Sequence, residues 1–148
     1  MHKKELRFRW VASGLAVGLL LGAIASPTGV HAQNGPTAGA QTVVDKVYST
    51  AQAGRGEEKF NQICTACHLV SDLSGSRLRE KWEDQTVGDV FNFISNSMPE
   101  GDPGSLTKDE YASIVAYLLK QSGYPAGEAD LPTDTAALAK VKIVPLPK

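Results

Sequence analysis

Both cysteines of the 148-residue chain and one of its three histidines lie in the stretch "ICTACHL", residues 63–69. Cys64 and Cys67 are three positions apart, and His68 follows the second cysteine directly. Four kinds of chemistry use thiols or an imidazole at such a spacing: a disulfide, a structural zinc site, a thiol–disulfide catalyst and a covalently attached haem.

Three of these alternatives fit the sequence poorly. A disulfide across C-x-x-C closes a very small loop, so it would constrain the unfolded chain little. A structural zinc ion needs four ligands, and this stretch supplies only three. A thioredoxin-like catalyst would need a strand–helix–strand context, and no strand pattern stands out. C-x-x-C-H is the attachment signature of a c-type haem, in which Cys64 and Cys67 form thioethers and His68 ligates the iron.

Residues 1–32 are predicted to be a secretory signal peptide. "MHKKELRFRW" carries four basic residues and one acidic residue, an uncharged apolar run spans Val11–Ala25, and Val30 and Ala32 are placed for cleavage before Gln33. The alternative is an uncleaved membrane anchor, but a spanning helix needs about 20 apolar residues. We therefore expect export to the periplasm and no stable membrane span after cleavage.

Cleavage would leave a small chain with few candidate metal ligands. His68 and Met98 would be its only histidine and methionine. Of the 15 basic and 16 acidic residues in the chain, four and one lie in the removed segment, so the net charge of the remaining 116 residues would be −4. That length suits one domain, and the acidic balance argues against nucleic acid as a partner.

Met98 is the candidate for the second axial ligand of the iron. It lies 30 residues beyond His68 and directly before Pro99. With a methionine ligand the iron would be closed and suited to electron transfer, whereas an open position would suit gas binding or peroxide chemistry. A single methionine after an apolar helix can also be core filler. Its position before a stiff loop favours ligation.

Hydrophobic periodicity predicts a mainly helical chain. We expect helices from about Ala53 to Ile63, over residues 86–98 with Thr86 as N-cap, and after an N-cap at Thr107. Residues 71–85 are expected to form a charged loop with about one helical turn. The predicted division is a flexible leader at residues 33–46, a domain at 47–127 and a C-terminal strap at 128–148. The strap would pack through its sparse apolar residues, Leu131, Leu138, Val141 and Ile143.

Four short stretches, "CTACH", "SMP", "GEEKF" and "SIVAYLL", resemble those of a class I c-type cytochrome of the small bacterial mono-haem kind. The flanking segments are similar to cytochromes associated with quinoprotein alcohol dehydrogenases. The resemblance implies an all-α cytochrome c-like fold, with three to four helices around one covalently bound haem, long loops and the extended strap. It also implies that the first and last helices cross, with Gly56 and Phe60 against Ile114 and Tyr117.

Several other side chains are candidates for contacts with the haem. The resemblance suggests that Trp82 donates its ring N–H to a propionate, although an ordinary core role fits equally. Phe91 and Ile94, with Phe93, are expected to wall the cofactor. Arg77 and Arg79 of the charged loop could pair with the propionates or be solvated.

Many cytochromes of this class carry a Gly-Pro shortly after C-x-x-C-H, and its proline carbonyl orients the histidine. No proline lies between His68 and Met98 here, so the chain departs from that pattern. A carbonyl among residues 73–75 is the alternative acceptor that we expect for the His68 ring N–H.

The predicted function is that of an exported one-electron carrier, not an enzyme. Its donor would be a periplasmic dehydrogenase, and its acceptor an oxidase or another cytochrome. One alternative is a fixed haem subunit of a periplasmic quinoprotein dehydrogenase complex. Another is a haem enzyme or gas sensor, which the absence of a second histidine in the mature chain disfavours.

Overall fold

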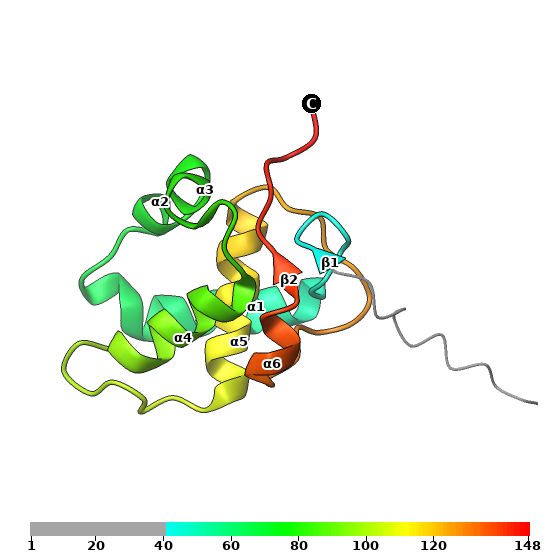
Figure 1. Ribbon diagram of the computed structural model, residues 1–148. Helices are drawn as coiled ribbons and strands as arrows, with labels where there is room; N and C mark the ends of the chain where they lie inside the picture. The colour runs from blue at the N-terminus through cyan, green and yellow to red at the C-terminus, as the bar shows by residue number, and fades with distance from the viewer. Residues whose placement is uncertain (1–40) are drawn as a thin grey trace, which may run out of the picture. The chain divides into compact units, whose positions relative to one another are not determined.

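The computed structural model describes residues 41–148. The predicted signal peptide at residues 1–32 and residues 33–40 of the predicted leader lie outside the described residues. The described part is mainly helical and has little strand, which confirms the expected all-α class (Figure 1).

Three long helices dominate this part of the chain: α1 (Thr50–Ile63), α4 (Val87–Ser97) and α5 (Lys108–Gln121). The shorter elements are β1 (Gln41–Thr42), the 3₁₀ helix η1 (Cys64–Ala66), α2 (Val70–Leu73), α3 (Ser76–Trp82), α6 (Thr135–Leu138) and β2 (Val141–Lys142). Over residues 41–148, every helix is too short or too polar to cross a membrane.

Side-chain caps set where the long helices begin. Thr86 and Asp89 form a capping box at the start of α4, as Thr107 and Glu110 do at α5. Both predicted N-caps are therefore confirmed. Helix α1 begins three residues before its predicted start, because the hydroxyl of Ser49 accepts a hydrogen bond from the backbone N–H of Gln52 at 3.0 Å.

The predicted crossing of the first and last long helices is confirmed: α1 packs against α5 (Figure 1). Gly56 permits the close approach, because a Cβ atom there would collide with the backbone carbonyl of Ser113. One turn further on, the rings of Phe60 and Tyr117 pack with their centroids 5.5 Å apart. Every residue from Tyr111 to Leu119 is buried, which is the pattern of a helix enclosed on all sides.

The charged segment after the cysteine motif contains more helix than the sequence predicts. Instead of one turn in a loop, it forms α2 and α3, separated by Gly75 with a φ of 65°. Leu78 anchors α3 in the core, and the Arg79 guanidinium donates to the backbone carbonyl of Ser122 at 2.9 Å. The backbone N–H of Gly75 also donates to the Ser122 hydroxyl at 2.9 Å. These contacts with the end of α5 are distant in sequence, so local charge patterning does not reveal them.

The C-terminal residues lie against the helices. The four apolar residues expected to fasten the strap are all at most 3% exposed: Leu131, Leu138, Val141 and Ile143. Gly88 of α4 has no side chain where α6 passes, and a Cβ there would lie 2.8 Å from the backbone nitrogen of Ala139.

Residues 41–46 of the predicted flexible leader lie within the described part of the chain, and they include a strand. Strand β1 pairs in parallel with β2, Gln41 beside Val141 and Thr42 beside Lys142. Val43 is completely buried in the core. Residues 41–43 are therefore held against the fold, because β2 supplies partners for their backbone hydrogen bonds. These partners are about 100 positions away, so the leader sequence alone does not reveal them.

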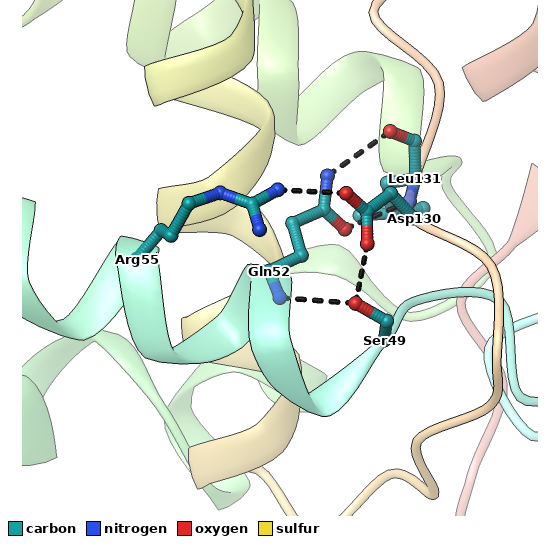
Figure 2. A network of polar contacts seen from close by, with 5 residues as sticks. All are labelled: Ser49, Gln52, Arg55, Asp130 and Leu131. Atoms are coloured by element: carbon teal, nitrogen blue, oxygen red, sulfur yellow. Dashed lines mark hydrogen bonds and ion pairs between the residues drawn. The ribbon is translucent and has the colours of Figure 1, made fainter.

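A polar network joins the start of the strap to the first turn of α1 (Figure 2). The fully buried Gln52 side chain donates to the carbonyl of Leu131 at 3.0 Å and accepts from its N–H at 2.7 Å. Asp130 accepts from the Ser49 hydroxyl and pairs with Arg55 at 2.7 Å. The Ser49 hydrogen bond, and then that from Arg55, hold the pKa of Asp130 below its ordinary value.

We expect opposite stability effects from two glycine substitutions in the same helix. Gly56→Ala should lower the free energy of unfolding by about 1–3 kcal/mol, because the new methyl group forces α1 away from α5. Gly54 has open space around its Cβ position, so Gly54→Ala should raise that free energy by about 0.5–1 kcal/mol through helix propensity. Denaturant unfolding measures both. Equal effects at the two positions would contradict the close-approach role of Gly56.

The ion pair between Lys59 and Glu110, at 2.7 Å, should make the α1–α5 contact sensitive to acid. The hydrogen bond from Lys59, with those from Thr107, lowers the pKa of Glu110 from 4.5 to about 2. A depressed folded-state pKa stabilises the fold above the unfolded-state value, and this contribution is lost as the pH falls from about 4.5 towards 2.

Glu110→Gln should therefore destabilise the protein at pH 7, and its difference from wild type should shrink as the pH approaches 2. Denaturant midpoints across that range test this. Glu58→Gln removes the same charge from an exposed site on α1 and should leave the midpoint nearly unchanged throughout. A difference for Glu110→Gln that is constant with pH would refute the assignment.

Candidate functional site

A cavity of about 330 Å³ lies among α1, η1, α2, α3, α4 and α5. Its volume is within the range of sites that bind small molecules and cofactors. The apolar side chains that line it are Phe60, Ile63, Leu73, Leu78, Val90, Phe93, Ile94, Leu106, Ile114 and Leu118.

The cysteine motif lies at one wall of this cavity. Its backbone turns tightly, because the N–H groups of Cys67 and His68 both donate to the carbonyl of Cys64, at 3.1 and 2.9 Å. All three side chains line the cavity as a result. Cys64 is half-buried, which raises the pKa of its thiol, and Cys67 is exposed; both thiols are free.

Met98 reaches the same cavity from a different element. It is the C-cap of α4, and its backbone N–H donates to the carbonyl of Ile94 at 2.8 Å. Its side chain is among those that line the cavity. The structure thus brings Met98 into one site with Cys64, Cys67 and His68, although 30 residues separate it from the motif.

Three aromatic and basic side chains meet near the same cavity. Trp82 lines it and contacts Phe93 edge to face, with ring centroids 5.5 Å apart. The Lys81 ammonium lies 4.2 Å from the Phe93 ring centroid and 5.1 Å from that of Trp82. A cation over an aromatic ring at such distances is attracted by the ring quadrupole. Sequence reasoning missed Lys81, because only the turn of α3 places its chain over both rings.

The remaining expected contacts divide into two groups. Ile94 and Arg77 line the cavity, as the sequence suggested. Phe91 does not: it is buried behind the wall and contacts Tyr111, with ring centroids 6.3 Å apart. Arg79 points elsewhere, since its guanidinium binds the Ser122 carbonyl. Within residues 41–148 the structure assigns no acceptor to the His68 ring N–H, so the expected carbonyl there stays a prediction.

Tyr111 is a lining residue whose polar role sequence reasoning missed. It was not singled out among the candidate site residues. In the structure its hydroxyl donates to the Met98 carbonyl at 2.7 Å and accepts from the N–H of Gly104 at 3.1 Å. The sequence offers one signal of this role: the core position holds tyrosine and not phenylalanine, and a buried hydroxyl needs a hydrogen-bond partner.

The residues of this cavity fit a covalently bound haem by their chemistry. Two thiols can form thioethers, and an imidazole and a thioether sulfur are both established iron ligands. The walls are largely apolar, and Arg77 and Lys81 supply cationic groups that can pair with propionate carboxylates. Among the described residues, no group of three or more histidine, cysteine or acidic side chains is arranged to hold a metal ion by itself.

Residues 51–118 match the profile of a protein family described as cytochrome c oxidase, cbb3-type, subunit III. The matched segment begins in α1 and ends in α5, so it contains the cysteine motif, Met98 and the walls of the cavity. It does not include the C-terminal strap. Searches of curated proteins and of solved structures found no significant match.

Proposed function

Because residues 51–118 of this chain belong to the class I c-type cytochromes and so hold covalently bound haem c, we propose that the protein is an exported one-electron carrier with His68 and Met98 as axial iron ligands. The observation that carries this proposal is the shared cavity, which is lined by Cys64, Cys67 and His68 together with Met98.

Cys64 and Cys67 are the proposed attachment points of the haem. The tight turn closed by the Cys64 carbonyl supports this role, because it places both thiols and the His68 imidazole along one cavity wall. No other thiol exists in the chain. The attachment therefore has only one available pair of sulfur atoms.

Met98 is the proposed second ligand. Its sulfur is the only soft donor other than the two thiols among residues 41–148, and it lines the same cavity. A thioether paired with a histidine raises the potential of a c-type haem and closes the iron to exogenous ligands. These properties suit a carrier better than an enzyme.

The bound haem supplies reversible one-electron exchange at its iron. The chain's own part is to position the iron ligands and to exclude water from the cavity. Apolar residues such as Leu78, Ile94 and Ile114 keep the cavity walls dry, which disfavours the more highly charged oxidised state. His68 and Met98 would remain bound in both oxidation states, so little rearrangement would accompany electron transfer.

Export and partner choice belong to the same proposal. The signal-like residues 1–32 support delivery to the periplasm, where we propose a dehydrogenase as donor and an oxidase or another cytochrome as acceptor. Leu69, directly after His68, is 69% exposed, and Phe93 at the cavity is 43% exposed. Such apolar surface is suited to brief contact with a redox partner.

A second candidate function is that of a fixed haem subunit in a larger redox complex, as in the periplasmic dehydrogenase alternative. The description of the matching family favours keeping it, since that description names a subunit of an oxidase. A haem enzyme or gas sensor has less support, because Met98 lines the cavity and is available as a second ligand that would close the iron.

Replacing the sulfur of Met98 tests its ligation. Met98→Leu keeps a similar volume, so we expect covalent haem to remain on a haem-stained denaturing gel. The oxidised spectrum should lose its methionine-to-iron charge-transfer band and become high-spin, and the reduction potential should fall. Ile94→Ala, which truncates a neighbouring wall residue without removing a donor, should retain the band. A wild-type spectrum in Met98→Leu would exclude Met98 as a ligand.

Fractionation of the native host distinguishes a free carrier from a fixed subunit. We expect the haem-containing chain in the periplasmic fraction, beginning at Gln33 by N-terminal mass analysis. On size exclusion it should elute at the size of a single mature chain. Elution only with a much larger partner would favour the subunit, and a mature protein that retains residues 1–32 would contradict export by cleavage.

A further inference from the structure

The loop from Met98 to Leu106 leaves the end of α4 and returns to the start of α5, with Tyr111 beneath it. We propose that Tyr111 is a positioning residue that holds the backbone of Met98 so that its sulfur stays on the iron. This inference rests on the proposed ligation by Met98 and assigns the residue that maintains it.

One hydroxyl joins both ends of this loop. The Tyr111 O–H donates to the Met98 carbonyl at 2.7 Å, where the loop begins. The same oxygen accepts from the N–H of Gly104 at 3.1 Å and, at the longer distance of 3.5 Å, from that of Leu106. A hydroxyl has one proton and two acceptor lone pairs, so these contacts use its full capacity.

The ring that carries this hydroxyl is buried and packed. Tyr111 is 2% exposed and lies in the first turn of α5, where its N–H donates to the Thr107 carbonyl at 3.1 Å. Phe91 of α4 contacts the ring edge to face. Tyr111 therefore joins the last turn of α4, the loop and α5 at a single point.

The peptide groups of Met98 are held on both sides as a result. Its N–H is bound to the Ile94 carbonyl of α4 at 2.8 Å, and its C=O to the Tyr111 hydroxyl of α5. With the backbone anchored twice, the sulfur can leave the iron only by rotation of its own side chain. Groups that orient a metal ligand in this way tune the strength of the bond they support.

Tyr111→Phe tests this role because it keeps the ring and removes only the hydroxyl. The carbonyl of Met98 and the N–H of Gly104 then lose their protein partner, which loosens the loop. In the oxidised holoprotein we expect cyanide to displace Met98 with roughly fivefold higher apparent affinity, the factor equivalent to one net hydrogen bond. The methionine-to-iron charge-transfer band should also weaken.

Tyr124→Phe is the matched control. Its hydroxyl likewise donates to a backbone carbonyl, that of Val144 at 2.7 Å, but Tyr124 does not line the cavity. This variant should bind cyanide as wild type does, even if its denaturant stability falls as far as that of Tyr111→Phe. Equal cyanide affinities for the two variants would overturn the positioning role and leave only a contribution to stability.

The Met98→Leu spectrum separates failure of this inference from failure of the proposed function. If Met98→Leu keeps the charge-transfer band, Met98 is not the ligand and both fail. If Met98→Leu loses the band while Tyr111→Phe behaves like Tyr124→Phe, ligation stands and the positioning role alone is overturned.

Hydrogen exchange in the wild-type holoprotein provides a second test, which holds even if Tyr111→Phe does not fold. The Gly104 amide, bound to the buried hydroxyl, should exchange at least tenfold more slowly than that of Gly101, as expected for a protected amide. The Gly101 amide donates no backbone hydrogen bond within residues 41–148. Equal exchange rates at the two glycines would contradict the anchored loop.

Discussion

The close approach of α1 and α5 at Gly56 is the constraint on which the rest of the structure depends. Without a side chain at that position, the backbone of α1 comes against that of Ser113, and Phe60 meets Tyr117 one turn further on. The cysteine motif continues directly from the end of α1, and Tyr111 stands near the start of α5. The crossing therefore helps to set how far the cysteine motif lies from the loop that carries Met98.

Helices α1 and α5 form part of the cavity wall, and other elements complete it. Helix α4 closes another part and ends at Met98, while α3 brings Trp82 and Lys81. The cysteine motif, Met98, Trp82 and Lys81 thus all lie at the ends of elements and not in their middles. The ends are fixed by capping boxes and by contacts such as those of Ser122, so the site depends on helix termination as much as on core packing.

Sequence reasoning predicted what local signals encode. The motif at residues 64–68, the N-caps Thr86 and Thr107, and the glycine at the crossing each carry their signal within a few residues. It failed where partners are distant: α3 exists because Leu78 and Arg79 contact other parts of the fold, and residues 41–43 are held against the fold because β2 lies beside them. Phe91 and Tyr111 show the finer limit, since periodicity predicts that a side chain is buried but not which neighbour it faces.

The pairing of β1 with β2 has a consequence for the entropy cost of closing the fold. Gln41 lies beside Val141, so this contact joins residues separated by 100 positions and is among the most non-local in the described chain. Closing so long a loop costs more chain entropy than closing a short one, so the buried side chains of both segments must offset that cost. The cavity walls all lie between Phe60 and Leu118, so the strands are not part of the wall and their pairing instead fastens the two ends of the described chain to each other.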